Sequence, residues 1–236
     1  MRTILEYIDQ QTDEYRNLSL FHFMRDDSLG LRRRLAFIPE LAHFVMSFAD
    51  MYAHVLRDEP AADQFQELVN AHTYEDGGHW KWFLADLVTL NEDSPQRVSE
   101  TLRQLWGPDT LKTRMLTYRI CRLGLGASSL EKLVLVQCIE AVGKVSLEHA
   151  APLGRELAKQ LPKPLVYFGS HHLDTESDHT LEEKDVRGRL EQVVLDPALR
   201  DSLRSLVNQT FEAFRGFSDD LHKVALAHTE RDSSPA

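Results

Sequence analysis

Residues 130–160 read LEKLVLVQCIEAVGKVSLEHAAPLGRELAKQ, a long helical stretch that carries Glu140 among apolar neighbours. No period-2 alternation typical of a strand interrupts it. Ser128 or Ser129 is a suitable N-cap for a helix that begins here. Pro152 cannot donate a backbone hydrogen bond, so we expect a kink or a break at that position.

The chain on both sides of this stretch is helical as well, because glycine and proline punctuate it only at wide intervals. Pro39 predicts a kink or a fresh helix start, and Gly77-Gly78 lies inside a predicted helix, which points to a packing or site requirement. We expect an all-α single domain of about seven to nine helices over residues 1–228, followed by a disordered polar tail over residues 229–236. The other expected helices cover residues 2–15, 18–26, 31–57, 61–90, 96–106, 110–123, 165–182, 183–195 and 197–228.

Composition excludes several classes of protein. The chain has 27 basic and 37 acidic side chains and a formal net charge of −10, which argues against nucleic-acid partners and anionic membrane surfaces. We find no signal peptide and no long uninterrupted apolar run, so we expect a cytoplasmic protein without a membrane partner. Two cysteines, Cys121 and Cys138, are too few for a disulfide framework, and we expect reduced, buried thiols.

The first candidate site lies in the segment HTYEDGGHW, residues 72–80. On one continuous helix, His72, Glu75 and His79 lie within about 60° of one another. We expect the next residue, Asp76, to be solvated. The three side chains form either a solvated polar face or half of a metal site, and the segment alone does not decide between these alternatives.

A second segment has the same seven-residue span from first to last histidine. His172, Glu176 and His179 also fall within about 60° of one another on a helix. Two such stripes are costly to bury unless a shared metal ion satisfies both. Glu140 is the candidate metal ligand from a third helix. The alternative explanation for this residue is an intrahelical ion pair with Lys144. Donor sets of imidazole and carboxylate suit iron, with Mn, Zn or Ni as other ions for the same site.

With these residues, the sequence resembles the haem-oxygenase-like diiron oxidase superfamily, whose helical fold is shared with haem oxygenase and the TenA thiaminases. The segment from Phe21 to Gly30 and the long stretch after it look like the opening helices of TenA-like proteins. The segment from Tyr167 to His179 looks like the His-x3-Asp/Glu-x2-His ligand helix of the superfamily. Glu140, about thirty residues before this helix, matches the mid-chain glutamate of these proteins.

The resemblance implies a haem-oxygenase/TenA-like helical bundle that binds one or two iron ions and oxidises a small organic molecule with O2. It also implies a homodimer. The ligands are expected at Glu75, His79, Glu140, His172, Glu176 and His179, with His72 as a ligand or a supporting donor. The superfamily usually places Glu and His seven residues apart on the first ligand helix. Here His72 occupies the first of these positions, which leaves the number of metal ions open.

Two other functions remain as alternatives. A TenA-like hydrolase without metal would act on a pyrimidine or a similar amine, with Cys138 as its nucleophile. Cys138 and Glu140 are about 200° apart on a helix, so we do not expect both to face one cavity. A non-enzymatic helical binding protein would use the polar cluster only as a hydrogen-bonded network.

Overall fold

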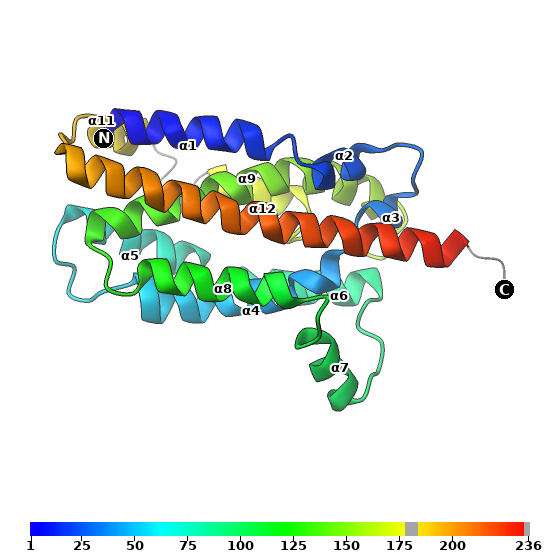
Figure 1. The fold of residues 1–236 in the computed structure, drawn as a ribbon. Coiled ribbons are helices and arrows are strands. Elements are labelled where there is room, and N and C mark those ends of the chain that lie inside the picture. Colours follow the sequence, from blue (N-terminus) through cyan, green and yellow to red (C-terminus); the bar gives the residue numbers. More distant parts are fainter. Residues whose placement is uncertain (178–183, 234–236) are drawn as a thin grey trace.

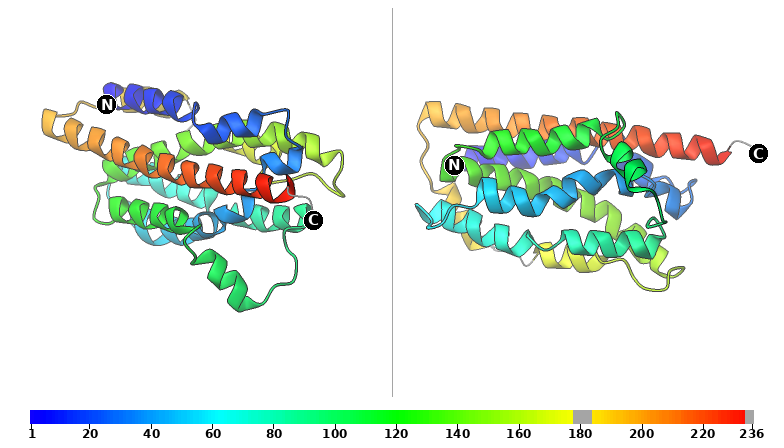
Figure 2. Two further views of the ribbon diagram at one scale, coloured as in Figure 1. Left: turned by 45° about the vertical axis from the view of Figure 1, so that its right-hand side comes forward. Right: turned by 90° about the horizontal axis from the view of Figure 1, so that it is seen from below.

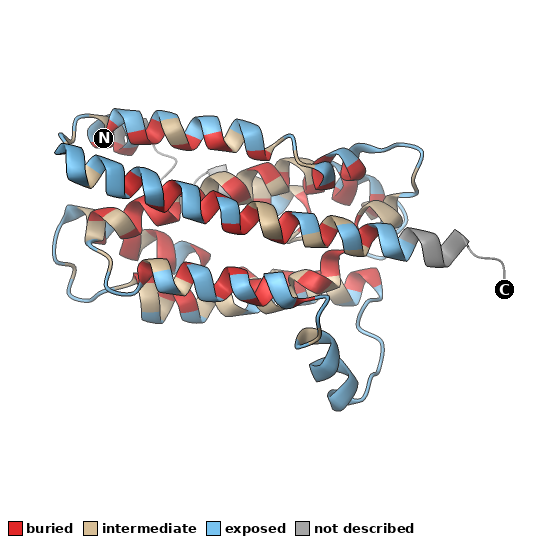
Figure 3. Ribbon diagram, viewed as in Figure 1, coloured by how far each residue is buried: buried red, intermediate tan, exposed pale blue. Residues whose placement is uncertain are grey.

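The computed structural model describes residues 1–177 and 184–233, and these residues form helices without any strand. The long helices run along one common direction, and α12 (Pro197–Ser233) extends along the whole bundle (Figure 1). The buried residues of the long helices face the interior of the bundle, and exposed residues cover its outside (Figure 3). The chain is therefore all-α, as predicted. None of the described helices is long and apolar enough to cross a membrane.

Helix α9 (Ser129–Ala158) is the central element, because it packs against helices from both halves of the chain. Residues 133–136 are completely buried, in agreement with their apolar character. Ser128 is the N-cap and forms a capping box with Glu131. The neighbours of α9 are α1 (Arg2–Tyr15), α2 (Ser19–Arg25), α3 (Leu31–Arg34), α5 (Gln64–Asp76), α8 (Leu111–Gly124), α10 (Ser170–Ser177) and α12.

The expected break at Pro152 does not occur, since α9 continues as one helix to Ala158. The turn after the proline is held by tertiary packing: Leu153, Gly154 and Leu157 are all buried. Gly154 is required there, because a Cβ atom would lie only 2.2 Å from the carbonyl oxygen of Phe168. This backbone segment thus packs closely against α9 in the turn after Pro152, which lacks a backbone donor.

The predicted helix over residues 31–57 is divided into several elements. Pro39 lies in the first turn of a 3₁₀ helix, which is the fresh start that a proline favours. The stretch ends in a short π-helix that begins at Tyr52. The elements are α3, η1 (Ile38–Leu41), α4 (Ala42–Met51) and η2 (Tyr52–Leu56).

The prediction of one helix over residues 61–90 is wrong. Helix α5 ends at Asp76, Gly77 is its C-cap, and α6 (Trp80–Leu90) begins three residues after Gly77. Two adjacent glycines each disfavour helix by roughly 1 kcal/mol relative to alanine, which agrees with the end of a helix at this position. His79 therefore precedes α6 and does not continue the stripe on α5.

The remaining elements complete the bundle, apart from one arm. Helix α7 projects away from the other helices (Figure 2). Helix α10 begins later than expected, because residues 165–169 form a loop that crosses α9. Helix α12 continues through residues 229–233, where we expected the tail to have begun. The elements not yet bounded are α7 (Val98–Leu105) and α11 (Lys184–Glu191).

Candidate metal centre

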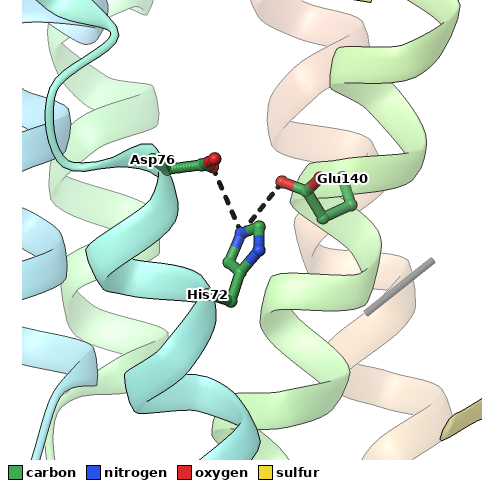
Figure 4. A group of neighbouring side chains, drawn as sticks. All are labelled: His72, Asp76 and Glu140. Atoms are coloured by element: carbon green, nitrogen blue, oxygen red, sulfur yellow. Dashed lines mark ion pairs between the residues drawn. The ribbon is translucent and has the colours of Figure 1, made fainter. Parts of the chain in front are cut away.

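His72 is at the centre of a buried polar group inside the bundle. Its imidazole is completely buried on α5, and its Nε2 atom lies 3.2 Å from Oδ2 of Asp76. The same Nε2 atom lies 3.1 Å from Oε1 of Glu140, which reaches it from α9 (Figure 4). Asp76 follows His72 by four residues and so shares its face of α5. Two carboxylates from different helices therefore converge on one imidazole nitrogen.

This group could hold a metal ion. One ligand atom each from His72, Asp76 and Glu140 lies within 4.8 Å of the other two. Imidazole nitrogen and carboxylate oxygen are the donors that mixed N/O metal sites use. Their burial fits this role, because a divalent cation compensates two carboxylates that are otherwise costly to remove from water.

In the absence of a metal ion, the two carboxylates favour the protonated form of His72. Burial by itself disfavours the charged imidazolium, but the nearby Glu140 and the hydrogen bond to Asp76 outweigh it and hold the pKa of His72 well above its ordinary value. The imidazolium thus neutralises part of the carboxylate charge. A metal ion would have to displace this proton, so metal binding and protonation of His72 compete.

Tyr52 is a further member of the group that sequence reasoning missed. Its hydroxyl donates a hydrogen bond to Oδ2 of Asp76 at 3.2 Å and lies 3.5 Å from Nε2 of His72. The residue is fully buried and begins the π-helix η2. Single π-turns frequently occur at functional sites, but the sequence carries no clear signal for one at this position.

Two more histidines lie beside the group. Nδ1 of His79 is 3.6 Å from Oδ1 of Asp76, and the rings of His79 and His172 are 4.7 Å apart. Nδ1 of His172 lies 3.0 Å from the carbonyl oxygen of Tyr167. A carbonyl only accepts, so Nδ1 carries the hydrogen of this contact. His79 therefore lies beside Asp76, His172 lies beside His79, and Trp82 stacks on His79.

The residues expected from sequence come together in part. His72, Glu140, His79 and His172 gather in one region from α5, α9, the turn before α6, and α10. His179 lies outside the described residues, and so does the side chain of Glu176.

The carboxylates on α5 differ from expectation. Glu75 is 31 % exposed and its closest oxygen is 4.0 Å from Nδ1 of His72, whereas Asp76 is only 7 % exposed and contacts Nε2. The expectation that Asp76 is solvated was therefore wrong. Helical spacing does not decide between the two carboxylates, because the residues three and four positions after His72 lie about 60° and 40° from it, on opposite sides.

A buried carboxylate outside the group holds the segment that leads to His172. Asp86 on α6 accepts hydrogen bonds from the backbone N–H groups of Val166 (2.8 Å) and Phe168 (2.9 Å). Burial raises the pKa of Asp86, although both backbone donors act in the opposite direction. Asp86 thus ties the loop before α10 to α6. No sequence pattern connects residues that are eighty positions apart.

An apolar cavity opens onto the candidate metal centre. Asp76, His79, Glu140 and His172 line one end of it. Cys138 is fully buried, burial raises the pKa of its thiol, and it is not among the described residues that line the cavity. Its position agrees with the predicted separation of Cys138 and Glu140 on opposite sides of α9.

No known family matches this chain when it is compared with family models, and no curated protein matches it either.

Proposed function

We propose that this protein is a metal-dependent oxidase or oxygenase that acts on a small organic molecule, with iron as its metal and O2 as the oxidant. One observation carries the proposal: a buried imidazole nitrogen lies 3.2 and 3.1 Å from two carboxylates of different helices, at the end of an apolar cavity. A purely structural polar network would need no such opening toward a cavity. The resemblance to the haem-oxygenase-like diiron oxidases supports the same function.

The donor set favours iron among the ions that imidazole and carboxylate bind. Hard carboxylates with one or more imidazoles, and no thiolate, are typical of non-haem iron sites that keep positions open. His72, Asp76 and Glu140 would hold the ion. His79 lies close to Asp76, and His172 lies close to His79, so both could become further ligands. A bound ferrous ion would supply the one-electron chemistry that O2 requires in order to react with an organic molecule.

The surrounding residues have separate tasks in this proposal. Tyr52 orients Asp76 through its hydrogen bond to Oδ2, as supporting groups around metal ligands commonly do. The carbonyl of Tyr167 fixes the tautomer of His172. The apolar cavity wall holds the substrate and excludes water, which protects reactive species from side reactions.

The test begins with metal content. Protein purified without chelators is analysed for metals, then emptied, reconstituted with Fe(II) under argon and exposed to O2. We expect stoichiometric iron, and faster oxidation of Fe(II) than in buffer. The Glu140→Gln variant keeps the side-chain shape but removes one negative charge, and it should lose both properties. Failure of the wild-type protein to retain any metal after reconstitution would exclude the proposed function. Tight metal binding without any reaction with O2 would retain the metal centre but exclude the oxidase.

A further inference from the structure

The cavity at the candidate metal centre is elongated along α9. The lining residues on α9 extend from Ile139 to Ala150, a distance of about 16 Å at the rise of an α-helix. The cavity has a volume of about 150 Å³. An engineered apolar cavity of about this size binds benzene, so the space is larger than O2 requires and suits a small organic molecule.

The far part of the cavity ends in hydroxyl groups. The hydroxyls of Tyr15 and Ser218 are hydrogen bonded at 2.6 Å, and both residues are buried and line the cavity. Ser146 lines it as well, and its hydroxyl donates to the carbonyl oxygen of Val142 at 2.9 Å. Each hydroxyl oxygen has two lone pairs and one hydrogen, so this cluster retains capacity for one more hydrogen-bonding group.

The two ends differ in charge. Asp76, Glu140 and the two histidines lie at the metal end, and no other described residue that lines the cavity is acidic or basic. Burial raises the pKa of Tyr15 to about 12, so its hydroxyl stays neutral at physiological pH. The far end therefore suits a neutral polar group, because none of the described residues that line it is charged.

The middle of the cavity is wide at Gly143, because glycine has no side chain. Gly143 lies one turn after Glu140 on the face of α9 that lines the cavity. A Cβ atom built on Gly143 would meet no atom within 4 Å. Packing against a neighbour therefore does not require glycine there, and the space belongs to the cavity. Aromatic rings such as Phe44, Phe214 and Phe217, which contact one another, also line the cavity.

We propose that the cavity binds an elongated, uncharged apolar molecule with one end at the metal centre and a hydroxyl or carbonyl group at the Tyr15–Ser218 end. Its length follows from α9, because Glu140 and Ser146 are separated by about 9 Å along the helix. This inference rests on the proposed function for the reaction, but binding itself does not require metal. Gly143 determines whether the molecule fits.

The first test measures binding of octan-1-ol to metal-free protein by the fluorescence of Trp80, which lines the cavity. We expect saturable binding to the wild-type protein. The Gly143→Leu variant should bind at least tenfold more weakly, because its side chain fills the middle of the cavity. The matched control is Gly188→Leu, which adds the same side chain at an exposed glycine of α11. Equal affinity in Gly143→Leu and wild type would overturn the inference, and so would an absence of binding to wild type.

A second test examines the polar end and does not depend on the folding of Gly143→Leu. Ser218→Ala and Tyr15→Phe should weaken octan-1-ol by about two- to tenfold, the range that one hydrogen bond explains. Neither variant should affect 1-chlorooctane, which lacks the hydroxyl. Unchanged octan-1-ol affinity in both variants would overturn the assignment of the polar end. Octan-1-ol binding without any metal binding would exclude the proposed function alone, whereas metal binding without octan-1-ol binding would exclude this inference alone.

Discussion

Replacing Asp76 by asparagine tests the assignment of the buried carboxylate most directly. The substitution keeps the size of the side chain and removes one of the two negative charges that contact Nε2 of His72. Loss of a buried hydrogen-bonded charge partner costs about 3–5 kcal/mol when the other charge is left alone. Glu140 remains, so we expect a smaller decrease of about 1–3 kcal/mol in the free energy of unfolding of the metal-free protein.

This decrease should depend on pH in a defined direction. The pKa of His72 is raised in the folded protein, so protonated His72 contributes stability fully below its ordinary pKa. That contribution disappears as the pH rises through the elevated folded pKa. Asp76→Asn lowers the pKa of His72 in the folded protein. The free energies of unfolding of variant and wild type should therefore differ most below about pH 6.5 and least in alkaline buffer. A difference that increases with pH would refute the reasoning.

The metal-binding assay gives an independent result for the same variant. We expect Asp76→Asn to weaken Zn(II) binding by about tenfold or more. Changing even a group that only supports the ligands reduces metal affinity by about 10–100-fold. Glu75→Gln is the comparison, because it changes the neighbouring carboxylate, which is partly exposed and 4.0 Å from Nδ1 of His72. It should change stability by less than about 0.5 kcal/mol. Equal losses of affinity in the two variants would refute the preference for Asp76.

Three further substitutions test the groups around the centre. Tyr52→Phe removes the hydroxyl that donates to Asp76, and it should lower metal affinity by about tenfold in equilibrium dialysis. Asp86→Asn places an amide N–H against one of two backbone donors. We expect urea unfolding to show a loss of about 1–3 kcal/mol in the free energy of unfolding, and the NMR signals of His172 to change. Unchanged signals of His172 would contradict the positioning role of Asp86. Cys138→Ala should cost about 1 kcal/mol through a small buried cavity and leave Fe(II) oxidation intact, whereas loss of Fe(II) oxidation would contradict a role for Cys138 in packing alone.

Local signals in the sequence were sufficient for much of the secondary structure. The helix over residues 2–15 was predicted with its observed bounds, because Ile4, Leu5, Ile8 and Tyr15 recur on one face and are buried. Residue type indicated Ser128 or Ser129 as the N-cap, and the structure shows that it is Ser128. The break that Pro152 made possible does not occur, and residues 165–169, which pack against the turn after Pro152, follow later in the chain.

The site could be predicted only as far as helical geometry applies. Glu140 was singled out because a carboxylate among apolar residues needs a partner, and the structure places it against His72. His79 was placed on the same helix as His72, but Gly77 and Gly78 end that helix, so its approach to Asp76 depends on the turn. For residues beyond such a break, the angular spacing along one helix no longer indicates in which direction a side chain points.

The amino-acid sequence alone determined the helical class, most helix positions and the presence of buried histidine and carboxylate side chains. These properties depend on periodicity and residue type within a few turns. The tertiary structure alone decided that Asp76 rather than Glu75 faces Nε2 of His72, and that Tyr52 and Asp86 support the site. Such contacts depend on how helices from distant parts of the chain pack, and packing selects one among several faces that the sequence makes available.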